Sequence, residues 1–295
     1  MEQAQRIAAG SIALGAVVLA LKAAAWAVTG SAALFSDAAE SVVNVAAALV
    51  AFGALSLAAK PADANHPYGH DKAEFFAAVI EGVLIVVASL VIVKQAWDAY
   101  RHPAPLAAPL LGMALNAASS GLNLLWALVL IRRGGKLRSA ALSADGRHLL
   151  SDVVTSAGVL LGVGLALATG LAWLDPAVAA ATAIYVLFSG LHVIGGSVGG
   201  LMDAAPAEQI IARVRRLVGE HAEGALEAHD LRMRQAGRLT YLEFHLVVPG
   251  AMTVSAAHDI CDRVEAALKA EVEGLVITIH VEPEGKAKHH GIIVV

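Results

Sequence analysis

The chain has 295 residues, of which 58% are hydrophobic and 16% are charged, and its formal net charge is −4. Its single cysteine, Cys261, excludes an intrachain disulfide and any metal site built from several thiolates. We expect Cys261 to be a small buried side chain of a hydrophobic core.

Apolar runs long enough to cross a bilayer recur through the first 200 residues. They are predicted near residues 7–28, 33–57, 74–97, 106–131, 139–169 and 174–200. The first run has no small-residue cleavage site after a short apolar core, so we interpret it as a membrane helix and not as a removed signal peptide. The sequence therefore predicts an α-helical membrane domain with six transmembrane helices over residues 1–204.

Basic residues in the short loops predict the orientation of these helices. One side of the predicted membrane collects most of them, namely Arg6, Lys60, Lys72, Arg132, Arg133, Lys136 and Arg138. The other side has Arg101 and little else. Because basic loops stay on the cytoplasmic side, both termini and the 58–73 and 132–139 loops are predicted to be cytoplasmic, in a bacterial-type inner membrane.

The last 95 residues differ in kind, with 14 Asp or Glu against 10 Lys or Arg, whereas residues 1–200 have 11 of each. This acidity argues against a nucleic-acid or lipid-surface role. The pattern predicts a helix at 206–221, strands at 225–235 and 239–248, a helix at 253–270 and a strand at 274–282. This αββαβ order is typical of an α+β ferredoxin-like cytoplasmic domain, here residues 205–284, and residues 285–295 are predicted to be a loose C-terminal tail.

Two polar pairs interrupt the apolar runs, and the members of each pair are about one helical turn apart. Glu40 and Asn44 lie in the second run, and His148 and Asp152 lie in the fifth. Ionisable groups in hydrocarbon are costly and by default mark an ion or proton pathway. The two runs enter from opposite sides, so a rise of about 1.5 Å per residue brings all four residues near the middle of a ~30 Å layer. We therefore predict one polar site between the two helices.

The chemistry of this predicted site suits a first-row divalent metal ion, because it offers one imidazole, two carboxylates and one amide oxygen. Ionised Glu40 and Asp152 together balance the charge of one divalent cation. An imidazole ordinarily changes its charge near neutral pH, so metal binding at His148 is expected to release a proton. Asp37 and Asp145 stand three residues before Glu40 and His148, which is weak internal symmetry of the kind that transporters built from repeats show. The alternative is a hydrogen-bond cluster that only holds helices together.

Two further groups of residues have metal-ligand chemistry. In the 58–73 loop, Asp63, His66 and His70 have the spacing of a small metal site, although a solvated loop explains them equally well. In the cytoplasmic domain the candidates share predicted strands, apart from one on the second helix, and they are His229, His245, His280, Glu282 and the helical His258. Strand histidines more often make only hydrogen bonds, so this tail site stays a hypothesis.

These residues make the chain resemble the cation diffusion facilitators, a family of proton-coupled exporters of zinc, iron and manganese. The resemblance covers nearly the whole chain and is carried by the stretch from Gly30-Ser31 to Asn44, by His66-Pro-Tyr-Gly-His70-Asp-Lys-Ala-Glu74, by Asp145 to Asp152 and by the acidic tail. It implies a homodimer with six membrane helices per subunit and a metallochaperone-like cytoplasmic domain. It also implies metal transport by alternating access in exchange for protons.

The resemblance assigns roles to the candidate residues. The family's transport-site positions fall on Glu40, Asn44, His148 and Asp152. Its loop-site positions fall on Asp63, His66 and His70. Its tail positions, which bridge the two subunits, fall on His229, His245, His280 and Glu282, with His258 nearby. A charge pair that locks the subunits together below the membrane falls on Lys72 and Asp203.

One departure from the family pattern leaves the metal open. Zinc-transporting members commonly carry Asp or His at the position of Glu40 and Asp at the position of Asn44, so this chain has one carboxylate fewer. Zinc is expected as the substrate, with Fe²⁺ or Mn²⁺ as alternatives, and no prosthetic group or enzymatic activity is expected. The competing functions are a membrane-bound metal sensor and an intramembrane metallohydrolase, although the chain has no His-Glu-x-x-His helix.

Overall fold

The computed structural model describes residues 2–103, 105–136, 140–288 and 291–293. It separates into two compact units, one of Met1–Gly53 with Ala77–Gly195 and the other of Ala54–Phe76 with Gly196–Val295. Arg138 lies outside the described residues, as do the side chains of Arg6, Lys136 and Asp145.

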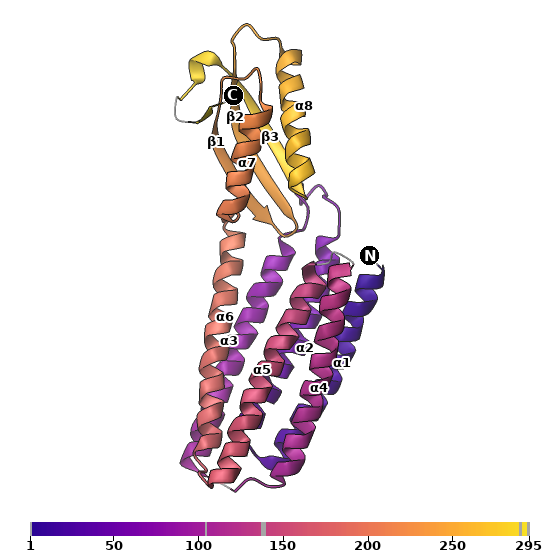
Figure 1. The fold of residues 1–295 in the computed structure, drawn as a ribbon, viewed down its shortest axis with the longest axis vertical. Helices are drawn as coiled ribbons and strands as arrows, with labels where there is room; N and C mark the ends of the chain where they lie inside the picture. The colour runs from indigo at the N-terminus through magenta and orange to yellow at the C-terminus, as the bar shows by residue number, and fades with distance from the viewer. Residues whose placement is uncertain (1, 104, 137–139, 289–290, 294–295) are drawn as a thin grey trace. The chain divides into compact units, whose positions relative to one another are not determined.

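Six long helices make up most of the first 200 residues, which confirms the predicted membrane architecture (Figure 1). Their bounds are α1 Glu2–Thr29, α2 Ala32–Ala58, α3 Ala73–Arg101, α4 Pro109–Lys136, α5 Ala140–Thr169 and α6 Leu174–Leu201. All six are long and apolar enough to span a membrane. Large exposed side chains such as Leu161 and Phe188 cover the outside of the helices, as expected for surfaces that face lipid.

The start of α2 is fixed by side chains that satisfy its free backbone N–H groups. Gly30 has a φ of +69° and ends α1, so the chain reverses within two residues. The Ser31 hydroxyl accepts a hydrogen bond from Leu34 N at 3.1 Å, as an N-cap does. From α6, the buried Asp175 accepts hydrogen bonds from Ala32 N at 2.7 Å and from the Ser31 hydroxyl. These contacts set the position from which Glu40 and Asn44 project.

Helices α3 and α6 approach each other closely at two glycines. A Cβ on Gly82 would lie 2.6 Å from the Ile194 side chain and 3.0 Å from the carbonyl oxygen of Gly190. A Cβ on Gly190 would in turn lie 3.1 Å from the carbonyl oxygen of Gly82. The close approach depends on small residues, which is a common packing mode for membrane helices.

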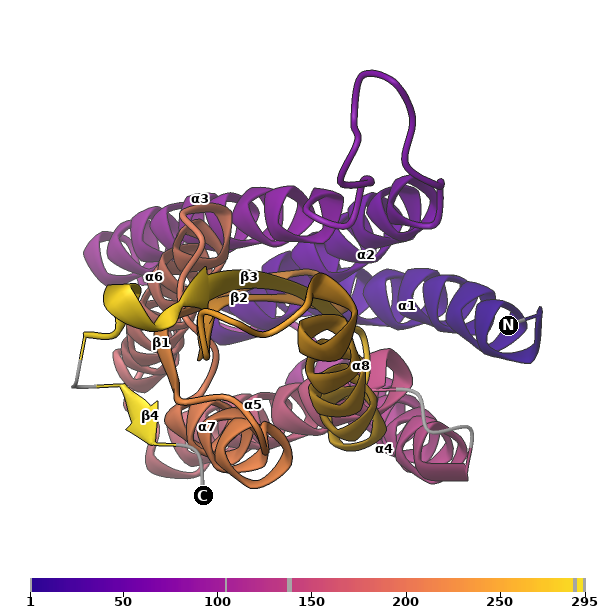
Figure 2. The same ribbon diagram turned by 90° about the horizontal axis from the view of Figure 1, so that it is seen from above.

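The C-terminal part has the predicted αββαβ order, with α7 Glu208–His221, β1 Glu227–Ala236, β2 Leu239–Val248, α8 Val254–Glu271 and β3 Leu275–Pro283. Strand β1 pairs antiparallel with β2, and β2 pairs parallel with β3. Both helices cover one face of the sheet (Figure 2). Their apolar sides bury a core that includes Val218, Phe244 and Val264. Cys261 belongs to this core, as expected, and burial raises the pKa of its thiol.

The C-terminal residues differ from the loose end that the sequence suggested. A short 3₁₀ turn at Glu284–Lys286 leads to β4, Ile292–Ile293, which pairs antiparallel with the outer edge of β1. The sheet therefore has four strands in the order β3-β2-β1-β4. The physical reason is that the edge of β1 offers unpaired backbone groups, and a two-residue strand is enough to satisfy some of them.

Candidate metal centres

The four intramembrane candidates line one small pocket, as the sequence predicts. Glu40 and Asn44 reach it from α2, and His148 and Asp152 reach it from α5. The rest of the wall comes from α3 and α6, with Ile85, Ala88, Tyr185, Val186 and Ser189. Asn44 and Asp152 are 108 residues apart in the sequence, and they thus share one polar site inside the helical unit.

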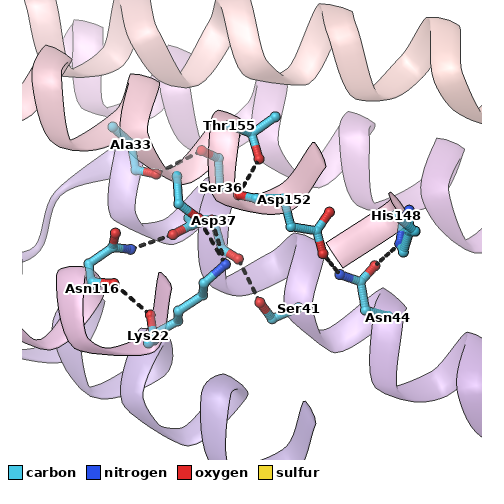
Figure 3. A network of polar contacts seen from close by, with 12 residues as sticks. Lys22, Ala33, Ser36, Asp37, Ser41, Asn44, Asn116, His148, Asp152 and Thr155 are labelled. Atoms are coloured by element: carbon cyan, nitrogen blue, oxygen red, sulfur yellow. Dashed lines mark hydrogen bonds and ion pairs between the residues drawn. The ribbon is translucent and has the colours of Figure 1, made fainter. Parts of the chain in front are cut away.

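Three of the four candidates, Asn44, His148 and Asp152, contact one another through polar atoms (Figure 3). The Asn44 amide donates a hydrogen bond to Asp152 Oδ2 at 2.6 Å, and its oxygen lies 3.3 Å from His148 Nε2. Asp152 is buried, whereas His148 is exposed. The Thr155 hydroxyl donates to the carbonyl oxygen of Asp152 at 2.9 Å, one turn further along α5. The Asn44 amide therefore contacts one of the two oxygens of the Asp152 carboxylate.

Glu40 has one buried oxygen, Oε2, that has no hydrogen-bond partner among the described residues. A buried polar atom without a partner is uncommon and requires an explanation, such as an ion or a proton. The oxygen belongs to a residue that lines the same pocket as Asp152 and His148. A cation in the pocket would satisfy it.

A second polar group beside this pocket is absent from the sequence-based prediction. Lys22 of α1 pairs with Asp37 of α2 at 2.8 Å, and both side chains are 1% exposed. Ser156 of α5 and Asn116 of α4 also donate hydrogen bonds to the Asp37 carboxylate. We call Lys22, Asp37, Asn116 and Ser156 the Lys22 cluster. Its signal in the sequence is a lysine inside the first apolar run, where an ionisable residue marks function by default.

The loop candidates come together in the second compact unit. His66 Nδ1 lies 3.2 Å from Asp63 Oδ1, and His70 Nε2 lies 3.5 Å from Asp63 Oδ2. Ligand atoms of all three residues lie within 4.8 Å of one another. The backbone N–H groups of His66 and Asn65 donate to Asp63 Oδ1, and they hold the pKa of this carboxyl below its usual range. The buried His70 Nδ1 has no hydrogen-bond partner among the described residues.

Strand register brings the tail histidines side by side. His229 on β1 stands opposite His245 on β2, which stands opposite His280 on β3. The ring centroids of neighbouring histidines are 5.3 and 4.9 Å apart. Glu282 joins them, since its oxygens lie 3.2 Å from His229 Nε2 and 3.4 Å from His245 Nδ1. These four candidates therefore form one cluster on the sheet.

Two carboxylates that were not predicted from the sequence complete this tail cluster. Glu227 Oε1 lies 3.1 Å from His229 Nδ1, and Asp230 belongs to a group with His229 and His245 whose ligand atoms lie within 4.8 Å of one another. Neither nitrogen of the buried His229 ring has a hydrogen-bond partner of good geometry among the described residues. Asp230 lies at a β-bulge and has a φ of +53°. No local pattern in the sequence predicts this irregularity.

The structure leaves His258 outside this cluster. His258 lies on α8, is exposed, and has Nε2 3.6 Å from Asp262 Oδ1 one turn along the helix. The C-terminal Lys288 approaches the cluster instead, with Nζ 2.5 Å from Asp230 Oδ2. This hydrogen bond is the main reason why the pKa of Asp230 is below its usual range.

Lys72 and Asp203 form an ion pair within one chain, with Lys72 Nζ 2.8 Å from Asp203 Oδ1. Arg234 Nη1 from β1 lies 3.3 Å from the same oxygen. Both cations, the lysine foremost, hold the pKa of Asp203 below its usual range. A second ion pair, between Arg238 and Asp71 at 3.0 Å, ties the β1–β2 hairpin to the residue before Lys72. The hairpin therefore contacts the loop that carries the three loop candidates.

The sequence matches two family profiles that together cover most of the chain. Residues 9–202 match the cation efflux transmembrane domain, and residues 206–284 match the cation efflux protein cytoplasmic domain. An uncharacterized transporter of Synechocystis is 42% identical over 273 residues, which cover 92% of this chain and 88% of the relative. The cation-efflux pump FieF of Serratia proteamaculans is 31% identical over 278 residues, covering 94% of this chain and 91% of the pump.

Solved structures of related proteins match the cytoplasmic part. A Zn form of a proposed zinc transporter, CzrB, is 47% identical, covers 28% of this chain and 96% of its own, and has a TM-score of 0.28. The metal-bound C-terminal domain of the CzcD transporter from Thermotoga maritima is 26% identical, covers 28% of this chain and 95% of its own, and has a TM-score of 0.26. The two matched family domains confirm the resemblance seen in the sequence, and this integral membrane protein belongs to the cation efflux, or cation diffusion facilitator, family of transporters.

Proposed function

We propose that this protein exports a divalent transition-metal ion across the membrane in exchange for protons. The observation that carries the proposal is the small pocket where Glu40 and Asn44 of α2 meet His148 and Asp152 of α5. Glu40 Oε2, which has no hydrogen-bond partner in the part of the chain that the structure describes, is the group that a cation would satisfy. Two carboxylates give the site the charge that one divalent ion neutralises.

Zinc is the proposed substrate, with Fe²⁺ or Mn²⁺ as alternatives. One imidazole among oxygen ligands suits first-row divalent metals and disfavours Mg²⁺ and Ca²⁺. CzrB, which matches the cytoplasmic part, is described as a proposed zinc transporter. Asn44 supplies a neutral oxygen where a further carboxylate would bind zinc more tightly, so the choice of metal is expected to be less strict than at a site with three carboxylates.

Proton exchange follows from the ligands that the metal requires. A metal-bound imidazole has lost its proton from the bonding nitrogen, and bound carboxylates are ionised. Entry of the metal therefore drives protons off His148 and the carboxylates, and its departure lets them return. If the two states of the transporter face opposite sides, each cycle moves metal one way and protons the other.

The proposed arrangement in the membrane has both termini and the loop with Asp63 in the cytoplasm, following the distribution of basic residues. We place the protein in a bacterial inner membrane as a homodimer, because its tail matches the cytoplasmic domain of the family. The loop and tail clusters are proposed to bind the same metal for regulation and not for carriage, since neither lies within a membrane-spanning helix. Lys72 and Asp203 are proposed to be the charge pair that locks the two subunits together below the membrane, as the family resemblance implies.

Two other functions compete with transport. A metal sensor would use the tail cluster and move no ion, and a metallohydrolase would use the membrane pocket to activate water. The pocket favours transport, because the Asn44 amide of α2 contacts both Asp152 and His148 of α5. The sequence also has no His-Glu-x-x-His helix that would position a water-activating base.

Purified protein in proteoliposomes tests the proposal. With a zinc-sensitive dye on one side, an imposed pH gradient should drive zinc movement, and collapse of the gradient by an ionophore should stop it. Zinc binding without movement would identify a sensor and overturn the proposal. Manganese and ferrous iron, measured in the same vesicles, rank the three metals.

A further inference from the structure

The Lys22 cluster lies beside the proposed transport site but contains none of its ligands. Lys22 Nζ donates to Asp37 Oδ1 at 2.8 Å and to Ser156 Oγ at 3.1 Å, and Ser156 donates to Asp37 Oδ1 at 2.7 Å. Asn116 donates to the other oxygen of Asp37. One buried carboxylate thus joins side chains from α1, α2, α4 and α5 (Figure 3).

The cluster uses the same two helices as the transport site. Asp37 precedes Glu40 by three residues on α2, and Ser156 follows Asp152 by four residues on α5. Because the two helices run antiparallel, both steps lead toward the same end, where α2 begins at Ala32 and α5 ends at Thr169. In the orientation proposed above, this end faces away from the cytoplasm.

Burial increases along this direction. His148 is exposed and Asn44 is half-buried, whereas Asp152 is 3% exposed and Asp37 is 1% exposed. Beyond the cluster, Ala33, Val159 and Val163 are part of a fully buried apolar group. The pocket is therefore sealed on its outer side, first by the Lys22 cluster and then by apolar packing.

We propose that the Lys22 cluster is the lock that closes the transport site on its outer side. Lys22 holds α2 and α5 together through Asp37 and Ser156, and it must release one of them before the two helices part and metal leaves. Lys22 and Asp37 are then positioning residues, since they act through the helices and not on the metal. This inference rests on the proposed alternating-access transport.

The lock hypothesis and a purely structural ion pair predict different results when both charged side chains, Lys22 and Asp37, are replaced by uncharged ones. Removal of one partner leaves a buried charge without its counter-charge, whereas replacement of both partners by uncharged side chains leaves no buried charge. If the pair serves only to neutralise charge, the double variant Lys22→Met with Asp37→Asn should behave as the wild type does. If the pair is a lock, the double variant should open outward more often.

The test measures access from outside in the full chain. Cys261→Ala removes the native thiol from the tail core, and Val163→Cys places a reporter in the buried group beyond the cluster. Proteoliposomes are treated on the outer side with a membrane-impermeant methanethiosulfonate reagent, and the labelling rate is measured. Lys94→Met is the matched control, because Lys94 and Asp98 form an exposed ion pair at 3.1 Å on α3.

We expect the double variant to be labelled at least about tenfold faster than the parent, because the balance between two states shifts with their relative stability. Ser156→Ala, which keeps both charges and removes one link to α5, should give a smaller increase, and Lys94→Met should give none. Labelling of the double variant at the parental rate would overturn the lock. If the double variant does not fold, an unchanged rate in Ser156→Ala overturns it instead.

Failure of the lock and failure of the proposed transport have different signatures. Labelling reports access alone and requires no metal flux. A parent protein that moves no metal under a pH gradient would refute the antiporter, whereas pH-driven flux with unchanged labelling would refute only the lock.

Discussion

The membrane pocket and the tail cluster present similar ligands but hold them in different ways. In the membrane, Asn44 and Asp152 belong to separate helices, and their contact depends on how α2 and α5 are placed. In the tail, the backbone ladder of three strands fixes His229, His245 and His280 side by side. Helices can shift against each other, whereas a strand register changes only in whole residues. The first arrangement suits a site that must open and close, and the second suits a site that binds without moving.

The surroundings of the membrane pocket and of the tail cluster also differ. In the membrane pocket, the protein's own Asn44 amide donates a hydrogen bond to the buried Asp152 Oδ2, and hydrocarbon around the helices offers no water as a substitute partner. In the tail, Lys288 holds Asp230 at an exposed edge where water competes. Loss of a ligand should therefore be far more damaging in the membrane than in the tail.

The largest effect is expected for Asp152→Ala, which should lower zinc flux at least about 100-fold, because it removes half of the formal charge of the pocket. Flux in proteoliposomes measures it. Asp98→Ala is the matched control, since Asp98 is an exposed carboxylate on α3. Size-exclusion chromatography and circular dichroism check that the variant is folded. Near wild-type flux would mean that the carried ion binds elsewhere.

Asn44→Asp should change which metal is preferred. A third carboxylate raises the formal charge of the pocket from −2 to −3 and replaces a weak neutral ligand with a charged one. Zinc should gain on manganese by roughly tenfold in competition, measured as flux of each metal in a mixture. The Asn44 amide would also stop donating to Asp152. An unchanged zinc-to-manganese ratio would mean that Asn44 faces away from the metal.

A milder effect is expected for His280→Ala in the tail cluster. If tail metal regulates, the zinc concentration for half-maximal flux should rise roughly fivefold, while flux at saturating zinc persists. His258→Ala is the control, because His258 pairs with Asp262 on α8 and lies outside the cluster. Complete loss of flux in His280→Ala would assign the tail a direct part in carriage.

The smallest effect is expected for the Lys72–Asp203 pair, since partly exposed ion pairs contribute only ~0–1 kcal/mol. Lys72→Asp should lower flux modestly, and adding Asp203→Lys should restore only part of it, because the new lysine would face Arg234. The pKa of Asp203 is lowered, so the pair stays intact above the ordinary range of aspartate and is lost only as the pH falls through the lowered value. Flux in Lys72→Asp at the wild-type level would leave the pair without a functional role.

Local patterns in the sequence were enough to predict the regular parts of the fold and to bring four candidate residues to one pocket. Apolar runs and alternation gave the six helices and the αββαβ order, because burial imposes those periods. Glu40 with Asn44 and His148 with Asp152 were visible because each pair lies on one helix face. The contacts of Lys22 could not be predicted from such local patterns, since Asp37 is 15 residues away and Ser156 is 134 residues away in the sequence. The position of Asp230 in the tail cluster depends on a β-bulge, and strand β4 depends on a two-residue pairing with β1. Both features arise from tertiary contacts, which local patterns do not predict.

Simultaneous recording of zinc and proton movement tests the central claim most directly. Wild-type proteoliposomes that contain a zinc dye and a pH dye should show zinc and protons moving in opposite directions, with both fluxes reversing when the pH gradient is inverted. Both should vanish in Asp152→Ala and persist in His280→Ala. Zinc movement without a counter-flow of protons, or proton-coupled zinc movement that survives Asp152→Ala, would contradict a metal/proton antiporter built on this pocket.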